Sequence, residues 1–426
     1  MSLRFLPLQL SVSLSLLGAL ACNVDGDDVT TTGVVLPNEP GPEQSEPRGF
    51  FVLETDYSST SVSLVDPGGE LLSPVFIGSA SADTGLSTAL SGDVVPPSGA
   101  LAGDEVVLID RDAAVLTWVK LETTAVRAQL NVGTGFAANP QDYVPVSDDK
   151  SYVTRFEQNG SSGLEDFDQG SDVLIIDPSA ASVVGRIDLA PVLEGEDPSY
   201  LPRATRALAA GERVLLLAQA GNALFEFLDT RLVVIDANTD AIEQVLVLEG
   251  MKSCANLALS PDGDELAIAC NGAFGQDPEQ GFPDAGIVIV ELADELVEQQ
   301  RFAASELGGE QVSALSYASA TSLLFTTYGR YSADASELLA PDTLRRLDLE
   351  RGALDEEPLV ATGASAFSLG DVRCAPLAGS CVLADAESEG GVLRRFEVAS
   401  DGSVSELGQV ATNPELGLPP RYLGAY

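Results

Sequence analysis

The sequence predicts an all-β fold, a seven-bladed β-propeller of four-stranded antiparallel blades. Two observations predict it: a short apolar strand that ends in an acidic residue recurs seven times, and successive recurrences lie about 55 residues apart. Regular repeats of this length are typical of propellers, in which each unit buries its faces against its neighbours. The repeated acids are Asp66, Glu122, Asp177, Asp236, Glu291, Asp348 and Glu397.

Each repeat contains strand-sized segments that we name a to d in chain order. In the fifth repeat these segments are residues 256–260, 265–269, 286–290 and 296–302. Apolar alternation on either side of a short polar turn also predicts a–b hairpins in two other repeats, at residues 143–156 and 312–325. Four antiparallel strands joined by short turns predict one blade per repeat.

The two ends of the propeller, which is predicted to span residues 49–426, indicate how the ring closes. The first repeat begins with a b-like strand at residues 50–55 and lacks a strand a of its own. The chain finishes with residues 418–426, which resemble the strand-a opening at 201–208. We therefore expect residues 420–426 to complete the first blade, because closure removes the exposed sheet edges of an open ring.

The N-terminus carries the features of a secretory signal peptide, predicted over residues 1–21. Arg4 precedes an apolar run at residues 5–17, and small residues follow it. The segment ends A-L-A-C, which resembles the bacterial lipobox, where the signal is removed before a lipid-modified cysteine, here Cys22. An ordinary signal peptide cleaved near Ala21 is the alternative.

Residues 22–48 are rich in proline, acidic residues and threonine and are predicted to be a disordered linker. No later segment has the roughly 18 consecutive apolar residues of a membrane-spanning helix. We therefore expect the lipid on Cys22 to be the link to the membrane. By resemblance to lipoprotein sorting signals, Asn23 after the lipidated cysteine favours the outer membrane of a bacterial cell envelope.

Charge and composition exclude several classes of function. The chain has 65 acidic and 22 basic residues, a net charge of −43, and no histidine. Nucleic acid is excluded as a partner because a polyanion repels it. The lack of imidazole excludes Ser-His-Asp triads and His-containing zinc sites, and the sequence offers no other nucleophile motif in the required structural context.

Four cysteines remain if Cys22 carries lipid. Cys254 and Cys270 lie at equal distances from the hairpin turn S-P-D-G-D, and Cys374 and Cys381 flank the turn A-P-L-A-G-S. Residues placed in this way face each other across a hairpin, so we expect two disulfides, typical of an oxidising compartment. Two pairs of buried free thiols are the alternative.

One segment of the fifth repeat resembles a known family. L-A-L-S-P-D-G-D-E-L-A-I-A-C (257–270), followed by G-I-V-I-V-E, and the looser V-P-V-S-D-D-K-S-Y-V (144–153) are similar to the repeats of YVTN-type, lactonase-like seven-bladed propellers. The resemblance implies a binding or scaffold propeller or, in some members, a lactone hydrolase. The fold alone does not decide between these functions.

Long connections are predicted on one face of the propeller. They are the b–c connections 157–172, 218–230, 271–285 and 328–341 and the d–a connections 78–93 and 191–203. The a–b turns are mostly short, and binding sites concentrate on long loops held by a rigid scaffold. We therefore expect a ligand or partner on the b–c/d–a face.

Two groups of charged residues are candidates for that site. Five basic residues near the predicted starts of a-strands could form a positive rim for a carboxylate or phosphate, unless they are simply solvated or internally paired: Arg203, Arg206, Lys252, Arg373 and Arg421. Three acids of the 157–172 connection could bind calcium, unless they are a solvated acidic loop: Asp166, Asp168 and Asp172. No other cofactor is expected.

These observations predict a cell-envelope lipoprotein whose propeller binds a protein, a glycan or a small anionic ligand. The alternative is a lactonase-like or other hydrolase in which carboxylates on the b–c/d–a face hold a divalent cation.

Overall fold

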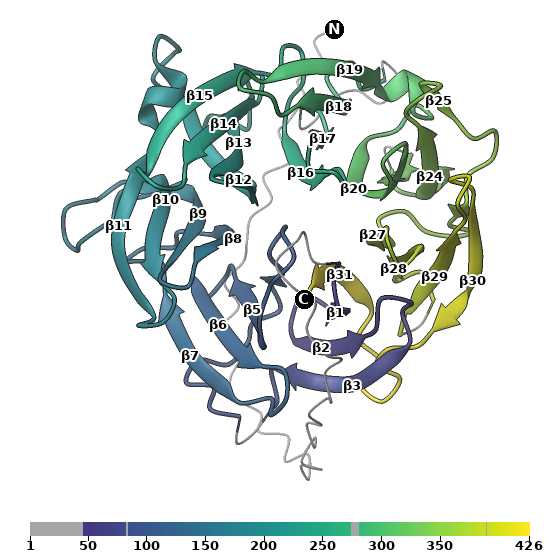
Figure 1. Cartoon of the computed structure of the whole chain (residues 1–426), viewed down its shortest axis with the longest axis horizontal. Coiled ribbons are helices and arrows are strands. Elements are labelled where there is room, and N and C mark those ends of the chain that lie inside the picture. The colour runs from purple at the N-terminus through teal and green to yellow at the C-terminus, as the bar shows by residue number, and fades with distance from the viewer. Residues whose placement is uncertain (1–45, 82–83, 274–280, 333, 389) are drawn as a thin grey trace, which may run out of the picture.

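The computed structural model of the chain describes residues 46–81, 84–273, 281–332, 334–388 and 390–426. Seven antiparallel sheets are arranged as blades around one central axis (Figure 1), which confirms the predicted propeller. In each blade, strand a is nearest the axis and strand d is at the rim. The signal peptide, Cys22 and most of the predicted linker lie outside the described residues.

The first four blades have regular four-stranded order. Their strands are β31 (Pro420–Ala425), β1 (Phe50–Thr55), β2 (Thr60–Val65) and β3 (Leu71–Gly78) in blade 1; β4 (Val94–Val95), β5 (Glu105–Asp110), β6 (Val115–Lys120) and β7 (Val126–Asn131) in blade 2; β8 (Pro140–Ser147), β9 (Lys150–Gln158), β10 (Gly170–Asp177) and β11 (Ser182–Asp188) in blade 3; β12 (Leu201–Ala210), β13 (Arg213–Gly221), β14 (Arg231–Asp236) and β15 (Ala241–Val247) in blade 4.

The last three blades include one with a divided outer strand. Their strands are β16 (Cys254–Leu259), β17 (Glu265–Cys270), β18 (Gly286–Glu291) and β19 (Val297–Ala303) in blade 5; β20 (Val312–Ser319), β21 (Ser322–Thr327) and β24 (Thr343–Asp348) with both β25 (Ala353–Leu354) and β26 (Val360–Ala361) in blade 6; β27 (Leu369–Ala375), β28 (Ser380–Asp385), β29 (Val392–Val398) and β30 (Val404–Val410) in blade 7. Pro358, which has no N–H to donate, lies between the two parts of the blade 6 outer strand.

Three short elements lie in the connections between strands. The hairpin β22 (Arg330–Tyr331) and β23 (Leu338–Ala340) is part of the b–c connection of blade 6, and the 3-10 helices η1 (Ala190–Leu193) and η3 (Ala304–Glu306) lie in d–a connections. The strands predicted for the fifth repeat agree with β16 to β19 within two residues at each end.

The C-terminal strand closes the ring as predicted. β31 pairs antiparallel with β1, with Val52 opposite Leu423. The backbone N–H groups of Arg48 and Gly49 both donate to the carbonyl of Tyr426, at 2.6 and 3.2 Å, and the Tyr426 side chain is 2 % exposed. The propeller contacts therefore begin slightly before the predicted boundary at residue 49.

The hydrophobic core consists of layers between neighbouring blades. One cluster joins blades 4 and 5, for example Leu217 with Ile268, and another joins blades 7 and 1, for example Val382 with Val52. The apolar alternation of each strand supplies both faces of its blade, so each blade is stabilised mainly by the two beside it.

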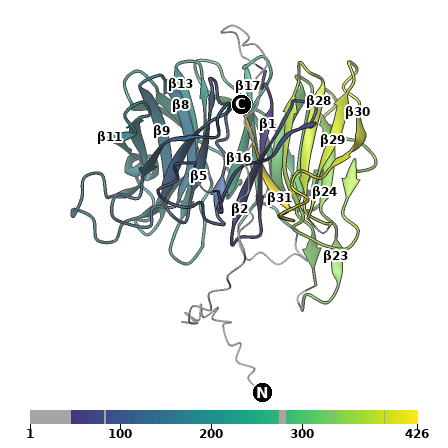
Figure 2. The same cartoon turned by 90° about the horizontal axis from the view of Figure 1, so that it is seen from below.

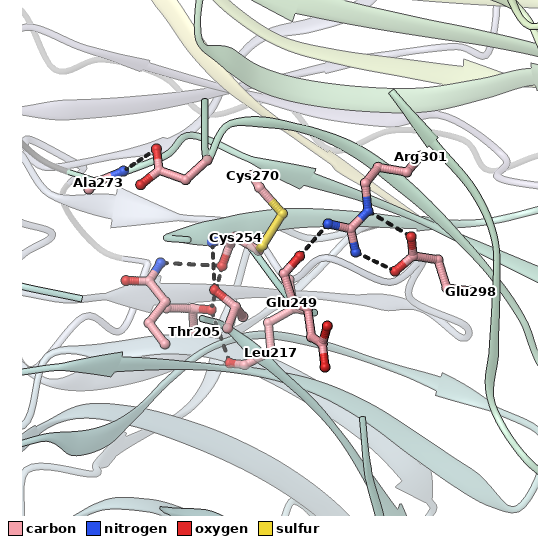
Figure 3. Close-up of a disulfide and its surroundings, with 11 residues drawn as sticks. Thr205, Leu217, Glu249, Cys254, Cys270, Ala273, Glu298 and Arg301 are labelled. Atoms are coloured by element: carbon pink, nitrogen blue, oxygen red, sulfur yellow. Dashed lines mark hydrogen bonds and ion pairs between the residues drawn. A yellow bond between two sulfur atoms is a disulfide. The ribbon is translucent and has the colours of Figure 1, made fainter. Parts of the chain in front are cut away.

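Both predicted disulfides are present. Cys254 and Cys270 are directly opposite each other in β16 and β17, and Cys374 and Cys381 are opposite each other in β27 and β28. Figure 3 shows the first of these bonds with Thr205 of the neighbouring blade beside it, where the Thr205 hydroxyl contacts the Leu217 carbonyl. Among the described residues, no helix has the length and apolar character required to cross a membrane.

Candidate functional site

The two faces of the propeller differ in the length of their connections. The b–c and d–a connections share one face, which we call the loop face, and the a–b and c–d turns share the other, which we call the turn face. Between β8 and β9 the a–b turn has two residues, whereas the following b–c connection spans residues 159–169. In Figure 2, β23 projects from the loop face, and the C-terminus lies at the opposite, turn face. This asymmetry agrees with the prediction.

The repeated acids at the ends of the c-strands are structural. The Asp177 carboxylate accepts the N–H groups of Ser179 and Ala180, and that of Asp236 accepts those of Asn238 and Thr239. These hydrogen bonds lower the pKa of both aspartates. Asp66 and Asp348 also accept a backbone N–H of the turns that follow them, so an aspartate closes the c–d turn in four of the blades.

The three acids proposed to bind calcium have different environments. Asp168 accepts backbone N–H groups of residues 163–165, which lowers its pKa, and Asp166 is exposed. Asp172 is fully buried, in ion pairs with Arg155 at 2.7 Å and Arg186 at 3.0 Å. Within the described ranges, no group of three or more acidic or cysteine side chains is arranged to hold a metal ion.

The Arg155–Asp172 pair is a structural feature that the sequence analysis missed. Both side chains are completely buried, and Arg155 also donates to the carbonyls of Val132 and Phe167. A buried charge requires such a complete set of partners. The pair fixes the b–c connection of blade 3 to blade 2. It is hard to predict from the sequence because Arg155 and Asp172 are 17 residues apart.

Two of the five predicted rim cations are neutralised by acids of the protein. Arg203 forms an ion pair with Glu157 at 2.8 Å and lies over the ring of Phe156. Lys252 lies 3.5 Å from Asp284. Both are located close to the starts of a-strands, as predicted. Their pairing with acids of the protein matches the alternative in which these cations are internally paired and do not bind a ligand.

Arg206 and Arg373 are located deeper in the channel than predicted, in the middle of β12 and β27 and not at the strand starts. Their guanidinium groups converge on one short segment: Arg206 donates to the carbonyl of Pro96 at 3.1 Å, and Arg373 donates to that of Ser98 at 3.0 Å. Burial lowers the pKa of Arg373, and the nearby positive charge of Arg206 adds to this effect. The ring therefore brings two cations together at its axis.

Arg421, the fifth predicted cation, is found at the loop-face end of the channel, near the start of β31. Its Nη1 donates to the carbonyl of Phe367 at 2.8 Å, and its Nε is buried without a hydrogen-bond partner. None of the ion pairs in the described part of the chain includes Arg206, Arg373 or Arg421. Three channel arginines thus form no direct ion pair, although the carboxylates of Asp142 and Asp371 act on Arg206 and Arg373 through space.

A cavity of about 370 Å³ opens beside Arg421, and we call it the mouth pocket. Its principal side chains come from three connections and the starts of the two strands β27 and β31: Tyr57, Tyr328, Phe367, Asp371, Arg421 and Tyr422. The Arg421 guanidinium lies 5.5 Å from the centre of the Tyr57 ring, and the rings of Tyr328 and Phe367 are 5.5 Å apart. Burial raises the pKa of Tyr328 and of Tyr422, so both phenols stay protonated at neutral pH.

Two aromatic residues of the mouth pocket are both exposed and conformationally restrained. Tyr57 is 63 % exposed with φ 66°, and Phe367 is 56 % exposed with φ 62°. A left-handed conformation is unfavourable for bulky residues and persists only where the surroundings impose it. The sequence analysis missed both residues, because one aromatic residue in a loop carries no periodic signal.

Close backbone packing imposes these conformations. A Cβ on Gly92 would lie 2.2 Å from the Tyr57 carbonyl carbon, and a Cβ on Gly370 would lie 2.1 Å from the Arg421 carbonyl oxygen. The buried Asp342 carboxylate accepts the N–H groups of Phe367, Ser368 and Leu369, and also that of Gly329 beside Tyr328. The mouth pocket is therefore held by fixed contacts on several sides.

Comparisons with known proteins agree with the fold. No protein family model and no curated protein matches this sequence. Among solved structures, a candidate 6-phosphogluconolactonase of Bacteroides fragilis has a TM-score of 0.54 at 12 % identity, covering 91 % of this chain and 100 % of its own.

Two further solved structures have similar scores. The periplasmic gluconolactonase of Pseudomonas aeruginosa has a TM-score of 0.51 at 12 % identity, covering 88 % of this chain and 98 % of its own. The Cps50 (Swd1) propeller domain of Myceliophteria thermophila has a TM-score of 0.56 at 14 % identity, covering 82 % of this chain and 94 % of its own. The chain is thus a seven-bladed propeller that resembles lactonase-like propellers in fold.

Proposed function

We propose that this protein is a cell-envelope lipoprotein, anchored through Cys22, whose propeller binds a small anionic ligand in its channel from the loop face. The observation that carries the proposal is the set of channel arginines that form no direct ion pair, Arg206, Arg373 and Arg421. The chain has about three acids for each base, and most of its other arginines pair with one.

The physical reason is the cost of a half-buried cation that has no direct counter-ion. Arg206 and Arg373 donate to neutral carbonyls, and the acids that act on them, Asp142 and Asp371, offset their charge only through space. A bound carboxylate or phosphate would supply both the opposite charge and the acceptors for the free guanidinium N–H groups. The part of the ligand that enters the channel must be small, because the net charge of −43 disfavours the binding of several anionic groups at once.

Thermal unfolding in the presence of simple anions tests this proposal. We expect acetate, citrate or phosphate at millimolar concentration to raise the melting temperature, with chloride at equal ionic strength as reference, because a ligand that binds the folded state stabilises it. Arg421→Gln should reduce the shift. Arg351→Gln is the matched control, because Arg351 is 81 % exposed on the turn face. If none of these anions shifts the melting of the parent protein, the proposal fails.

The membrane anchor requires a separate experiment. We expect radioactive palmitate to label the parent protein in bacterial cells, and Cys22→Ser to abolish the label and release the protein from the outer-membrane fraction. If a Cys22→Ser protein still carries palmitate, the modified residue is not Cys22. Co-purification from detergent-solubilised membranes would also identify a partner protein.

The carboxylate-metal hydrolase remains a prediction from the family resemblance. Metal analysis of the purified propeller distinguishes it from the binding module. One tightly bound divalent cation per chain, together with a lower melting temperature in EDTA, would support the hydrolase.

A further inference from the structure

The mouth pocket combines chemical groups that a simple anion does not need. A carboxylate or phosphate is satisfied by Arg421 alone, yet the pocket also presents the exposed rings of Tyr57 and Phe367. The ligand must therefore offer an apolar face in addition to its charge, because an exposed aromatic ring gains binding energy only from a surface that covers it.

The fold fixes the backbone at both of these rings. Both residues adopt left-handed backbone conformations, which bulky side chains rarely adopt. Although Phe367 contacts Tyr328 and Tyr57 contacts Arg421, more than half of the surface of each residue is exposed. Gly92 and the buried Asp342 fix them instead, so the rings are preorganised and lose little freedom when a ligand covers them.

The polar groups around the rings specify the rest of the ligand. The Nη1 of Arg421 donates to the Phe367 carbonyl, and its Nη2 can donate to a carboxylate, whereas its Nε is buried away from solvent. One oxygen of Asp371 accepts the N–H of Leu423 at 3.1 Å, and its other oxygen can accept from a hydroxyl group. The protonated phenols of Tyr328 and Tyr422 can donate to a hydroxyl or accept from one.

An acidic sugar carries this combination of groups. A pyranose ring presents weakly positive C–H groups on its face, which suit the negative face of an aromatic ring. Its hydroxyl groups suit the carboxylate and the phenols, and the carboxylate of a uronic acid suits Arg421. An organic cation is disfavoured because Arg421 already lies over Tyr57.

We propose that the mouth pocket binds one uronic acid residue of a glycan, with the sugar ring on Tyr57 and Phe367 and its carboxylate on Arg421. This inference rests on the proposed function and names the ligand class for the loop-face end of the channel. A volume of about 370 Å³ is at the small end of ligand pockets, which suits a single sugar residue at the end of a chain.

Calorimetric titration with matched oligosaccharides tests the inference. The probes are trimers of galacturonate, glucuronate and mannuronate, each paired with its methyl ester, which keeps the ring and removes the charge. We expect the parent protein to bind at least one acidic trimer about tenfold more tightly than its ester, since a charge-assisted hydrogen bond contributes about that much.

Three variants separate the roles of the residues. Arg421→Gln should abolish the preference for the acid over the ester, and the double variant Tyr57→Ala, Phe367→Ala should weaken binding of both about tenfold. Phe225→Ala is the matched control, an aromatic residue that is 67 % exposed with φ 59° on the same face outside the pocket. It should bind like the parent, and the melting temperature of each variant verifies that it is folded.

The outcomes distinguish this inference from the proposed function. If simple anions stabilise the parent protein but no trimer binds, the sugar assignment is overturned and the anion-binding module stands. If Phe225→Ala weakens trimer binding as much as the double variant, the mouth pocket is not the site. If neither trimers nor simple anions bind, both proposals fail.

Discussion

Glu54 is a buried carboxyl group with a strongly raised pKa. It is completely buried in β1, where Ser63 donates to one carboxyl oxygen at 2.6 Å and Asn413 donates to the other at 3.0 Å. Burial raises its pKa to about 7, although these hydrogen bonds favour the ionised form. Because Asn413 belongs to the connection between blades 7 and 1, Glu54 links that connection to the first blade.

The raised pKa predicts a specific dependence of stability on pH. Above the ordinary pKa of 4.5 the unfolded chain releases this proton while the folded chain retains it up to about pH 7. The contribution of Glu54 is therefore fully present below pH 4.5, falls as the pH rises to 7, and is then constant. The Glu54→Gln variant lacks this loss. We therefore expect the unfolding free energy of the variant minus that of the parent to increase by about 3 kcal/mol from pH 4 to pH 8.

Urea unfolding at pH 4, 6 and 8 measures this difference. Glu415→Gln is the matched control, because Glu415 is exposed in the same connection as Asn413. Parallel stability profiles for the parent and Glu54→Gln would show that Glu54 ionises normally in the folded protein.

At the scale of the elements, the two disulfides tie together strands a and b of blades 5 and 7. Each joins neighbouring strands close to the axis, where the a-strands have no further sheet partner on their inner side. The bond between Cys254 and Cys270 spans 16 residues and that between Cys374 and Cys381 spans seven. Chain entropy predicts a somewhat larger contribution from the longer loop.

We expect Cys254→Ala, Cys270→Ala to lower the unfolding free energy by about 3 kcal/mol. The pair Cys374→Ala, Cys381→Ala should have a smaller effect and serves as the matched comparison. Reducing agent should lower the melting temperature of the parent protein and have less effect on each double variant. The parent protein could also be treated with reducing agent while it is unfolded. If its melting temperature then stays the same, the cysteines are free thiols.

At the scale of the whole molecule, the ring depends on one strand from the far end of the chain. β31 supplies strand a of blade 1, and Leu423 and Tyr426 are buried between blades 7 and 1 and against blade 2. Gly424 allows this packing, because a Cβ there would lie 2.1 Å from the Phe51 ring. Without this strand, β1 becomes an open edge and two interblade layers lose contacts.

A truncation after Leu418 is therefore expected to destabilise the whole propeller. Removing buried Leu and Tyr side chains together with a strand costs well above about 4 kcal/mol, so we expect a broad, early unfolding transition in calorimetry. Leu423→Ala should lower stability by about 2–5 kcal/mol, whereas Leu407→Ala, at a site 56 % exposed, should change it by less than about 1 kcal/mol. A truncated chain that melts like the parent would contradict ring closure.

The architecture could be predicted from the sequence because it is repeated. Acids such as Asp177 and Asp236 recur at the blade period, and each closes the same turn. The cysteine pairs were predictable for a related reason, since hairpin register is set by local turns. Information of this kind lies within a few tens of residues along the chain.

The site could be predicted only in part, because it depends on contacts between distant segments. The sequence identified Arg373 as a channel cation, but its place in the middle of β27 depends on strand boundaries. Tyr57 and Arg421 are 364 positions apart and meet only because the last strand joins the first blade. Asp172 has the residue type of a calcium ligand, and only the fold shows its two arginine partners.

The contact between Arg48 and Tyr426 has a practical consequence for engineering this protein. Because both ends of the propeller meet within one blade, a short peptide could join residue 426 to residue 48 covalently. New ends could then be opened in an exposed b–c connection such as residues 160–166. Circular permutants of this kind would move the break in the chain from the first blade to the third while the order of blades stays the same.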